Sequence, residues 1–553
     1  MVSMPIIEVD REYLYSLLGM RLNRDELAEI LEDTKVNIEG FSDEGVELEI
    51  TSDRLDLLSA EGIARMIKGL IGREIGIPKY PIEHRKEELL VDESVKKVRP
   101  FAVGAVLLDV KLNDKTIKSI IQCQEKIHET IGRKRRRVAI GIHDLDAVKP
   151  PFKYVARPME KVKFIPLGES REMTAKEILE ETEKGREYGY LIRNEENLVP
   201  LIEDSMDRVM SMPPVINAEL TRLKKETRNL FIDVTGTDEK SIRTALSILV
   251  HSIAETGARI GVITVRDSGR EIKQPDVDPR RMRVSIEYIR RMLGEEIKRE
   301  DVINLLRKGR LDAELAGEDE INVMIPPYRT DFLHPADVAE EVIVLYGLNK
   351  LKPQLPRNVM TVGSIHPCEK ISRKLRILMV GLGYQEVMNY MLSNKESLFK
   401  SIGRAETEVV EIGNPVSSSY TVLRDSLIPG LLHFLSRNVH SPYPQKIFEI
   451  GDVVLVDRSN PYRTKSERRL AAAYSDDSVG FEDIQSHLFA VLRSMRIDFK
   501  LREANNSIFI EGRCAEIVAE KVIGIIGEVN PEVLLKLGIS SPTAMFEVKI
   551  YEY

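Results

Sequence analysis

A short acidic stretch constrains this chain more than any other feature of its sequence. Within residues 327–347, Asp331 precedes Asp337, Glu340 and Glu341. The last three stand at i, i+3 and i+4, which brings them together on the surface of one helix. Carboxylates this close repel one another unless a cation or a basic partner joins them. The stretch is therefore either a solvated acidic face or a site for a hard cation, for which oxygen ligands suit magnesium.

The bulk composition narrows the class of protein. A length of 553 residues predicts about three to five domains. Its three cysteines lie far apart and form no CxxC pair, which indicates a reducing compartment and no zinc knuckle. Neither a secretion signal nor an apolar segment long enough for a membrane span is visible, so we expect a cytoplasmic protein.

Charge is unevenly distributed along the chain. The net charge of −8 argues against a general nucleic-acid coat. Residues 133–137 are nevertheless five consecutive basic residues, followed by an apolar strand at 138–140. This run is equally consistent with a phosphate contact and with a solvated loop.

The pattern of elements predicts an α+β multidomain protein in four parts. Apolar periodicity and capping residues define these parts, and the charged run 83–88 and the proline-rich run 353–356 read as linkers between them. The parts are a small α+β domain (1–82), an α/β domain (90–270), a compact helical, winged-helix-like module (273–352) and an α+β domain with an antiparallel sheet (357–553).

Local signals predict the individual elements. Asn23 with Glu26, and Ser59, are expected to cap helices, while Pro335 and Gly347 should begin and end the acidic helix. Strands are predicted at 6–9, 47–50, 103–108, 231–234, 321–325, 387–392, 446–450 and 470–474. Helices are predicted at 117–131, 240–256, 286–293, 302–306 and 371–380.

Several separated motifs occur in a fixed order along nearly the whole chain. They are TSDRLDLLSAEGIAR (51–65), GIHDLD (141–146), SMPPVIN (211–217), FIDVTGTD (231–238), the acidic motif, NP (414–415), LRDSLIPGLL (423–432), FEIG (448–451) and GEVNP (527–531). In this order and spacing the chain resembles the β subunit of phenylalanyl-tRNA synthetase, in its shorter archaeal and eukaryotic form.

The resemblance implies partners and cofactors. It implies an (αβ)2 heterotetramer that uses ATP to join phenylalanine to tRNA(Phe). The α subunit would perform the ligation, while the β subunit would supply structure, tRNA contact and proofreading. It also implies that Asp331, Asp337, Glu340 and Glu341 bind a magnesium ion shared with the α subunit, which would hold the subunits in register.

The last part of the chain resembles a class II synthetase catalytic fold that has lost its activity. Arg424 stands where an active enzyme has a phosphate-binding arginine in an F-R-x-E context, but the Phe and Glu are missing. No arginine follows Gly524 and Gly527 before Pro531, and phosphate activation needs such positive groups. We expect this domain to pack against the α subunit. The apolar face of Leu427, Leu431, Leu432 and Leu435 is either core or interface.

Discrimination between tyrosine and phenylalanine calls for a second site. An apolar pocket rejects an isostere that adds a hydroxyl by only about 100-fold, whereas a pocket that hydrogen-bonds the hydroxyl does far better. The resemblance implies that residues 90–270 form a domain that hydrolyses tyrosyl-tRNA. Asp233 would then recognise the tyrosine hydroxyl or amine, unless it only caps the turn after it. Thr235 and Ser211 would add hydroxyl contacts, and Asn217 would hold the ester end or a water molecule.

Residues 217–221 depart from the family, in which many members carry a Gly/Asp/His-containing segment there. This departure argues against a histidine-based mechanism and leaves the attacking water to the backbone and the terminal hydroxyls of the tRNA. Two other functions remain open. In the first, the chain is a non-catalytic RNA-binding or partner-docking scaffold with a degenerate editing fold. In the second, it is a free-standing nucleic-acid regulator built on 273–352 and 133–137.

Overall fold

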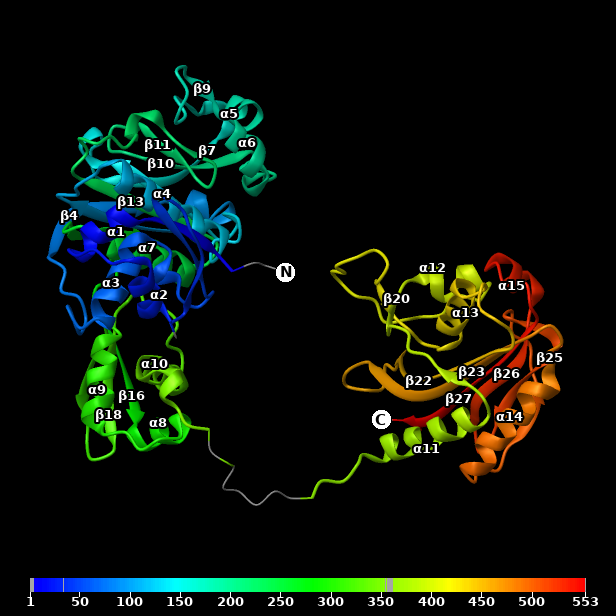
Figure 1. Ribbon diagram of the computed structural model, residues 1–553. Coiled ribbons are helices and arrows are strands. Elements are labelled where there is room, and N and C mark those ends of the chain that lie inside the picture. The colour runs from blue at the N-terminus through cyan, green and yellow to red at the C-terminus, as the bar shows by residue number, and fades with distance from the viewer. Residues whose placement is uncertain (1–3, 33, 354, 356–361, 553) are drawn as a thin grey trace. The chain divides into compact units, whose positions relative to one another are not determined.

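The computed structural model describes residues 4–32, 34–353, 355 and 362–552, and the chain divides into two compact units (Figure 1). The N-terminal unit comprises Met1–Leu355 and the C-terminal unit Pro356–Tyr553. Both mix helices with sheets, so the chain is a mixed α/β multidomain protein. None of the described helices combines the length and the apolar character needed to cross a bilayer. The predicted linker 353–356 falls partly outside the described residues.

A three-stranded antiparallel sheet and three helices open the N-terminal unit. The sheet has the order β1-β3-β2. The predicted capping box is confirmed, because Asn23 accepts from the Glu26 backbone while Glu26 accepts from that of Asn23; Ser59 caps the third helix. The elements are β1 (Ile6–Asp10), α1 (Arg11–Leu18), α2 (Arg24–Leu31), β2 (Val36–Phe41), β3 (Gly45–Ile50) and α3 (Ala60–Leu70).

A ten-stranded sheet forms the centre of the N-terminal unit. Its order is β12-β11-β10-β7-β4-β14-β5-β13-β6, with β15 paired to β14. The strands are β4 (Ile82–Val91), β5 (Phe101–Leu108), β6 (Val138–Asp144), β7 (Phe152–Pro158), β10 (Leu198–Glu203), β11 (Val209–Met212), β12 (Ile216–Asn217), β13 (Leu230–Gly236), β14 (Arg259–Asp267) and β15 (Arg270–Gln274). The accompanying elements are α4 (Asp114–Glu129), β8 (Lys163–Phe164), β9 (Met173–Thr174), α5 (Ala175–Glu181), α6 (Glu183–Tyr188) and α7 (Glu239–Ala254).

The prediction that 83–88 is a linker is wrong. These residues belong to β4, which pairs in parallel with both β14 and β7. The alternating charges compensate one another along the strand, since Arg85 bonds to Glu83 and to Glu87. A charged composition is therefore compatible with a strand here, because the charges on one of its faces neutralise each other.

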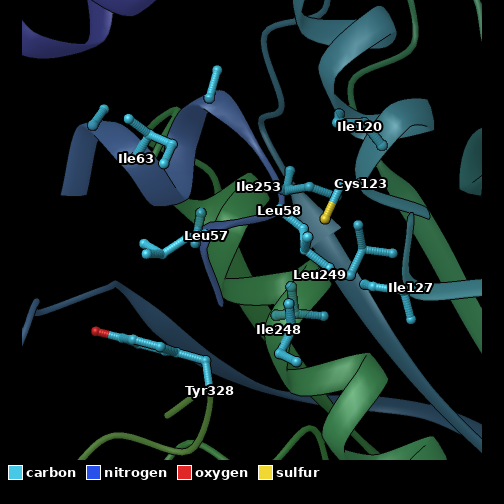
Figure 2. Packing of buried hydrophobic residues seen from close by; sticks show 14 of the residues in the cluster. Leu57, Leu58, Ile63, Ile120, Cys123, Ile127, Ile248, Leu249, Ile253 and Tyr328 are labelled. Carbon is cyan, nitrogen blue, oxygen red and sulfur yellow. The ribbon is translucent and has the colours of Figure 1, made fainter. Parts of the chain in front are cut away.

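One hydrophobic core joins the elements β1 to α3 to the helices α4 and α7, which accompany the large sheet. Figure 2 shows Leu57 and Ile63 on one side of this cluster, Cys123 of α4 and Leu249 of α7 on the other, and Tyr328 at its edge. All five side chains are buried. Burial of this kind stabilises the fold by roughly 25 cal/mol per Å² of apolar surface, so these segments form one packed body.

A small module at one end of the N-terminal unit carries the acidic helix (Figure 1). Pro335 and Gly347 bound this helix as predicted. The module's antiparallel sheet has the order β16-β18-β17, and only β18 is predicted from the sequence. The elements are β16 (Arg280–Ser285), α8 (Ile286–Leu293), α9 (Arg299–Lys308), β17 (Asp312–Leu315), β18 (Glu320–Ile325) and α10 (Pro335–Tyr346).

The C-terminal unit is built on a seven-stranded sheet of order β19-β22-β23-β27-β26-β25-β24, which is antiparallel except for the pair β19–β22. The seven strands of this sheet are β19 (Gln385–Glu386), β22 (Gln445–Val456), β23 (Thr464–Ser475), β24 (Lys500–Glu503), β25 (Phe509–Val518), β26 (Val522–Val529) and β27 (Thr543–Glu552). Two further strands, β20 (Leu392–Ser393) and β21 (Val422–Leu423), pair with each other in a separate two-stranded sheet. The helices are α11 (Pro367–Gly381), α12 (Lys395–Leu398), α13 (Ile428–Arg437), α14 (Phe481–Ser494) and α15 (Pro531–Lys536).

The structure decides two predictions made from the sequence of this unit. The strand predicted at 387–392 is wrong except at Leu392, since β19 ends at Glu386 and β20 begins at Leu392. The apolar face of α13 belongs to the core, because Leu427, Leu431, Leu432 and Leu435 are all buried in one cluster. The four-part division, the winged-helix likeness and the class II likeness stay predictions.

Candidate active site

A cavity of about 540 Å³ lies in the N-terminal unit between α4, β6 and the segment 211–223. Most of its lining is apolar, and a few polar groups converge on it, which is typical of a site for a small molecule. Three of the four residues proposed for the editing pocket line it. The lining side chains include Ile117, Ile121, Ile140, Ile142, Leu167, Ser211, Val215, Asn217, Thr221, Leu223 and Asp233.

Asp233 reaches the cavity because of the alternation of β13. Leu230, Ile232 and Val234 enter the core shared with α4 and α7, so Phe231 and Asp233 lie on the other face of the sheet. The Asp233 side chain is 1% exposed, and an unpaired carboxylate in such a place costs several kcal/mol. A partner is therefore required.

His143 on β6 supplies that partner. Its Nε2 lies 2.7 Å from Oδ2 of Asp233, and its Nδ1 lies 2.8 Å from Oγ1 of Thr221. His143 has no exposed surface and is not part of the cavity lining, so it stands behind the carboxylate. His143 belongs to the motif GIHDLD, but the sequence alone predicts no role for it. The available signal was a histidine directly after the apolar run 138–142 of β6, since the contact of His143 with Asp233 spans 90 residues and leaves no local pattern.

Ser211 and Asn217 face each other across β11 and β12. Both line the cavity, and Ser211 is 1% exposed. Within the described part of the chain, Oγ of Ser211 is a buried atom that has no hydrogen-bond partner. A buried hydroxyl without a partner is unfavourable, so this atom is available to a bound ligand.

Thr235 lies apart from these residues. Its hydroxyl accepts a hydrogen bond from Nε of Arg99 at 3.1 Å, and its carbonyl accepts one from Nη2 at 2.8 Å. Burial lowers the pKa of Arg99 to about 10, although the charge of Asp233 acts in the opposite direction. Thr235 thus holds a buried cation near Asp233, and its direct contact with a substrate stays a prediction.

The basic run 133–137 is divided between two environments. Arg135 is buried, and its Nη1 donates to the carbonyls of Pro214 and Val215 in the cavity wall at 3.2 Å each. Arg133 and Lys134 are exposed. The run is therefore neither wholly solvated nor wholly a surface patch, since one of its members supports the candidate site.

The acidic motif in the N-terminal unit is neutralised by basic side chains. Nη2 of Arg329 lies 2.7 Å from Asp331 and 2.8 Å from Glu341. Burial disfavours the charge of Arg329, but these two carboxylates outweigh it and hold its pKa well above the ordinary value. Nζ of Lys35 lies 3.1 Å from Glu340.

Asp337 is bonded to the backbone and not to any basic side chain that the structure describes. One of its carboxylate oxygens accepts from the backbone N–H groups of Leu333 and His334 at the start of α10. Among the described residues no three Asp, Glu, His or Cys side chains converge as metal ligands. In this arrangement the donor set does not fit a magnesium ion, because its carboxylates are already bonded to other groups. Magnesium binding stays a prediction.

Arg424 in the C-terminal unit is also internally bonded. Its Nη1 lies 2.6 Å from Glu449, and its Nε donates to the carbonyl of Asp452 at 3.0 Å. Both Arg424 and Glu449 are buried. A guanidinium held in this way is not free to bind a phosphate.

Three family models match the chain. The phenylalanyl tRNA synthetase beta chain CLM domain matches residues 351–550, the tRNA synthetase B5 domain residues 282–348, and the B3/4 domain residues 98–255. Two of these descriptions are of tRNA synthetase domains, which indicates an aminoacyl-tRNA synthetase chain. The candidate active site falls within the B3/4 match, and the acidic motif within the B5 match.

Curated relatives match over nearly their whole length. The chain is 52% identical over 550 residues to the phenylalanine–tRNA ligase beta subunit of Korarchaeum cryptofilum, covering 99% of this chain and 98% of the relative. It is 40% identical over 553 residues to that of Pyrococcus furiosus, covering 99% of each chain. A crystal structure of an N-terminal fragment of the phenylalanyl-tRNA synthetase beta subunit from Pyrococcus horikoshii aligns with a TM-score of 0.60 and 38% identity, covering 62% of this chain and 100% of the fragment. The chain belongs to the family of phenylalanine–tRNA ligase beta subunits.

Proposed function

We propose that the chain is the proofreading and scaffolding subunit of a phenylalanine–tRNA ligase, and that the cavity beside Asp233 hydrolyses tyrosyl-tRNA(Phe). One observation carries this proposal. The buried carboxylate of Asp233 lines a largely apolar cavity, and its Oδ1 accepts no hydrogen bond from any residue that the structure describes. Such an oxygen is suited to accept a hydrogen bond from a phenolic hydroxyl.

The asymmetry of hydrogen bonding explains how this cavity separates the two amino acids. Tyrosine pairs its hydroxyl with Oδ1 of Asp233, whereas phenylalanine would displace water from Oδ1 and leave that oxygen without a partner. Sites built in this way discriminate by about 10⁴-fold or more. Phenylalanyl-tRNA would thus be spared while tyrosyl-tRNA is bound and hydrolysed.

Positioning accounts for the hydrolytic step. His143 stands behind Asp233 and does not reach the cavity surface. Ser211 and Asn217 line the cavity and present polar side chains that can orient the ester and a water molecule. Holding reactants in the reactive geometry lowers the barrier without a dedicated base, and the terminal hydroxyls of the tRNA would complete the arrangement.

Ligation is assigned to an α subunit, in an (αβ)2 heterotetramer that uses ATP and binds tRNA(Phe). The internal bonding of Arg424 supports this assignment, because the C-terminal unit then lacks that arginine as a phosphate ligand. Magnesium shared with the α subunit is proposed only for the assembled enzyme. There Asp331, Glu340 and Glu341 would have to exchange their basic partners for the ion.

The test measures two activities of the chain co-expressed with its α subunit. Phenylalanine charging and tyrosyl-tRNA(Phe) hydrolysis are assayed for the unaltered complex, for Asp233→Ala and for the control Asp457→Ala, which lies in a loop of the C-terminal unit. We expect Asp233→Ala to abolish hydrolysis and to preserve charging, while Asp457→Ala changes neither. If the unaltered complex does not hydrolyse tyrosyl-tRNA, the chain is a scaffold. If Asp233→Ala hydrolyses it at the normal rate, the site lies elsewhere.

A further inference from the structure

Thr221, His143 and Asp233 form a chain of hydrogen bonds, and both ends of this chain border the cavity. Thr221 contacts Nδ1 of His143, and Nε2 of His143 contacts Oδ2 of Asp233. All three side chains are at most 1% exposed. Thr221 and Asp233 border the cavity, whereas His143 does not. His143 is therefore placed to act through the carboxylate rather than on a ligand.

The carboxylate of Asp233 decides which nitrogen of His143 carries a proton toward it. A carboxylate oxygen can only accept, so Nε2 of His143 donates to Oδ2 of Asp233 at 2.7 Å. Nδ1 pairs with Oγ1 of Thr221 at 2.8 Å, the shortest contact of that hydroxyl, which also lies 3.3 Å from the Ala218 carbonyl and 3.5 Å from the Met210 carbonyl.

This assignment orders the two oxygens of the carboxylate. A carboxylate is an acceptor at both oxygens. Oδ2 is held by His143, while Oδ1 accepts nothing from the described residues. Fixing one oxygen fixes the plane of the group, so a ligand meets Oδ1 in a single orientation.

Gly141 keeps that carboxylate in place. It lies opposite Asp233 in the register of β6 and β13. A Cβ at position 141 would overlap with Oδ2 of Asp233 and stand 2.6 Å from Nε2 of His143. Its φ does not lie in the left-handed region, so the glycine is required for space and not for backbone freedom. A methyl group there would separate the carboxylate from the imidazole.

We propose that Thr221, His143 and Gly141 are the positioning residues that make Asp233 selective for a phenolic hydroxyl. The inference rests on the proposed function of the cavity, and it names what sets the selectivity of that site. The phenol donates to Oδ1, while the proton of His143 remains on Nε2 and holds Oδ2. No covalent bond changes in this step.

The test compares His143→Leu, which removes the donor, with His143→Gln, whose side-chain amide restores a donor at similar reach. Binding is measured calorimetrically with two non-hydrolysable probes, the amide-linked 3′-tyrosylamino- and 3′-phenylalanylamino-3′-deoxyadenosines. The protein is the co-expressed complex. We expect the preference for the tyrosyl probe to fall by about 10- to 100-fold in His143→Leu, as for loss of one hydrogen bond to a charged group, and to recover in His143→Gln.

Two further variants separate positioning from damage to the fold. Gly141→Ala should lower the same preference, whereas Gly413→Ala, where a Cβ meets nothing within 4 Å, should not. A purely structural role of His143 would weaken both probes equally and leave their ratio unchanged, and that result overturns the inference. Thermal unfolding of each variant identifies those that fail to fold. If His143→Leu is among them, the ratio of probe affinities in His143→Gln decides between a positioning role and a structural role.

The outcomes distinguish this inference from the proposed function. If the complex hydrolyses tyrosyl-tRNA and His143→Leu retains the probe preference, the inference fails and the function stands. If the complex hydrolyses nothing but prefers the tyrosyl probe through His143, the function fails and the inference stands. Equal binding of both probes by the unaltered complex overturns the inference.

Discussion

Replacing Arg329 with leucine tests whether a buried cluster of charges joins the acidic helix to the N-terminal module. The cluster contains the cations Arg54, Arg65 and Arg329 and the anions Asp56, Asp331 and Glu341, and all of these residues except Asp331 are buried. Arg329 bonds to Asp331 and Glu341, while Asp56 bonds to Arg54 at 2.8 Å and lies 3.9 Å from Arg65. Removal of Arg329 leaves two carboxylates, each with a side chain 7% exposed, without their main partner.

The structure gives the size of the effect. Breaking a buried ion pair by removing one partner costs about 3–5 kcal/mol. We expect Arg329→Leu to cost about 5 kcal/mol because it orphans two carboxylates. Glu341→Leu should cost about 3 kcal/mol, because Arg329 keeps Asp331. At about 1.3 °C per kcal/mol for a unit that spans Met1–Leu355, these losses lower the Tm by roughly 7 °C and 4 °C.

Differential scanning calorimetry of the full-length chain measures both losses. The double variant Arg329→Leu/Glu341→Leu should be less destabilised than the sum of the single variants, since the second substitution removes a charge that the first had orphaned. Arg21→Ala is the control, because its partner Glu12 is exposed and such pairs contribute less than about 1 kcal/mol. A Tm loss in Arg329→Leu no larger than in Arg21→Ala, or strict additivity in the double variant, would refute the reasoning.

Acid, core truncation and magnesium each provide a separate test. Burial acts to raise the pKa of Asp56, but Arg54 outweighs it and holds the pKa at about 2. Because a lowered carboxyl pKa stabilises the fold above pH 4, about 2 kcal/mol of unfolding free energy should be lost in acid titrations between pH 4 and 2. Asp56→Asn should not show this loss. Leu249→Ala in the buried core should cost about 2–5 kcal/mol in denaturant unfolding, and a cost below 1 kcal/mol would contradict the packing described. Glu340→Gln/Glu341→Gln should weaken magnesium-dependent assembly with the α subunit; an unchanged heterotetramer with unchanged metal content would contradict the proposed magnesium role.

Local chemistry made many elements of the fold predictable. The capping pair at Asn23 and Glu26, and the proline and glycine that bound α10, act within a few residues, so sequence alone carries them. The error at β4 has the opposite cause. Its strand identity comes from parallel pairing with β14 and β7, and its charges cancel between neighbours. The charged composition of residues 83–88 is therefore typical of a linker, although long-range pairing makes these residues a strand.

The candidate site was predictable only in part for a similar reason. Asp233 was found through the resemblance, and the structure places it at the cavity with Ser211 and Asn217. Its contact with His143 spans 90 residues, and the contact of His143 with Thr221 spans 78. No local pattern encodes such contacts. At the acidic motif, by contrast, the sequence did allow for a basic partner, and Arg329 stands two residues before Asp331.

The register of the sheet ties the candidate site to the core. Asp233 lies between Gly104 of β5 and Gly141 of β6, whereas Ile232 pairs with Ile142. A slip of one residue between β6 and β13 would put an isoleucine beside the carboxylate and would turn the core side chains to the other face. The burial that stabilises the sheet therefore also fixes the distance between His143 and Asp233. Because Thr221 lies in a short 3-10 helix (Glu219–Thr221) outside the sheet, the selectivity of the cavity can change there while the fold is retained.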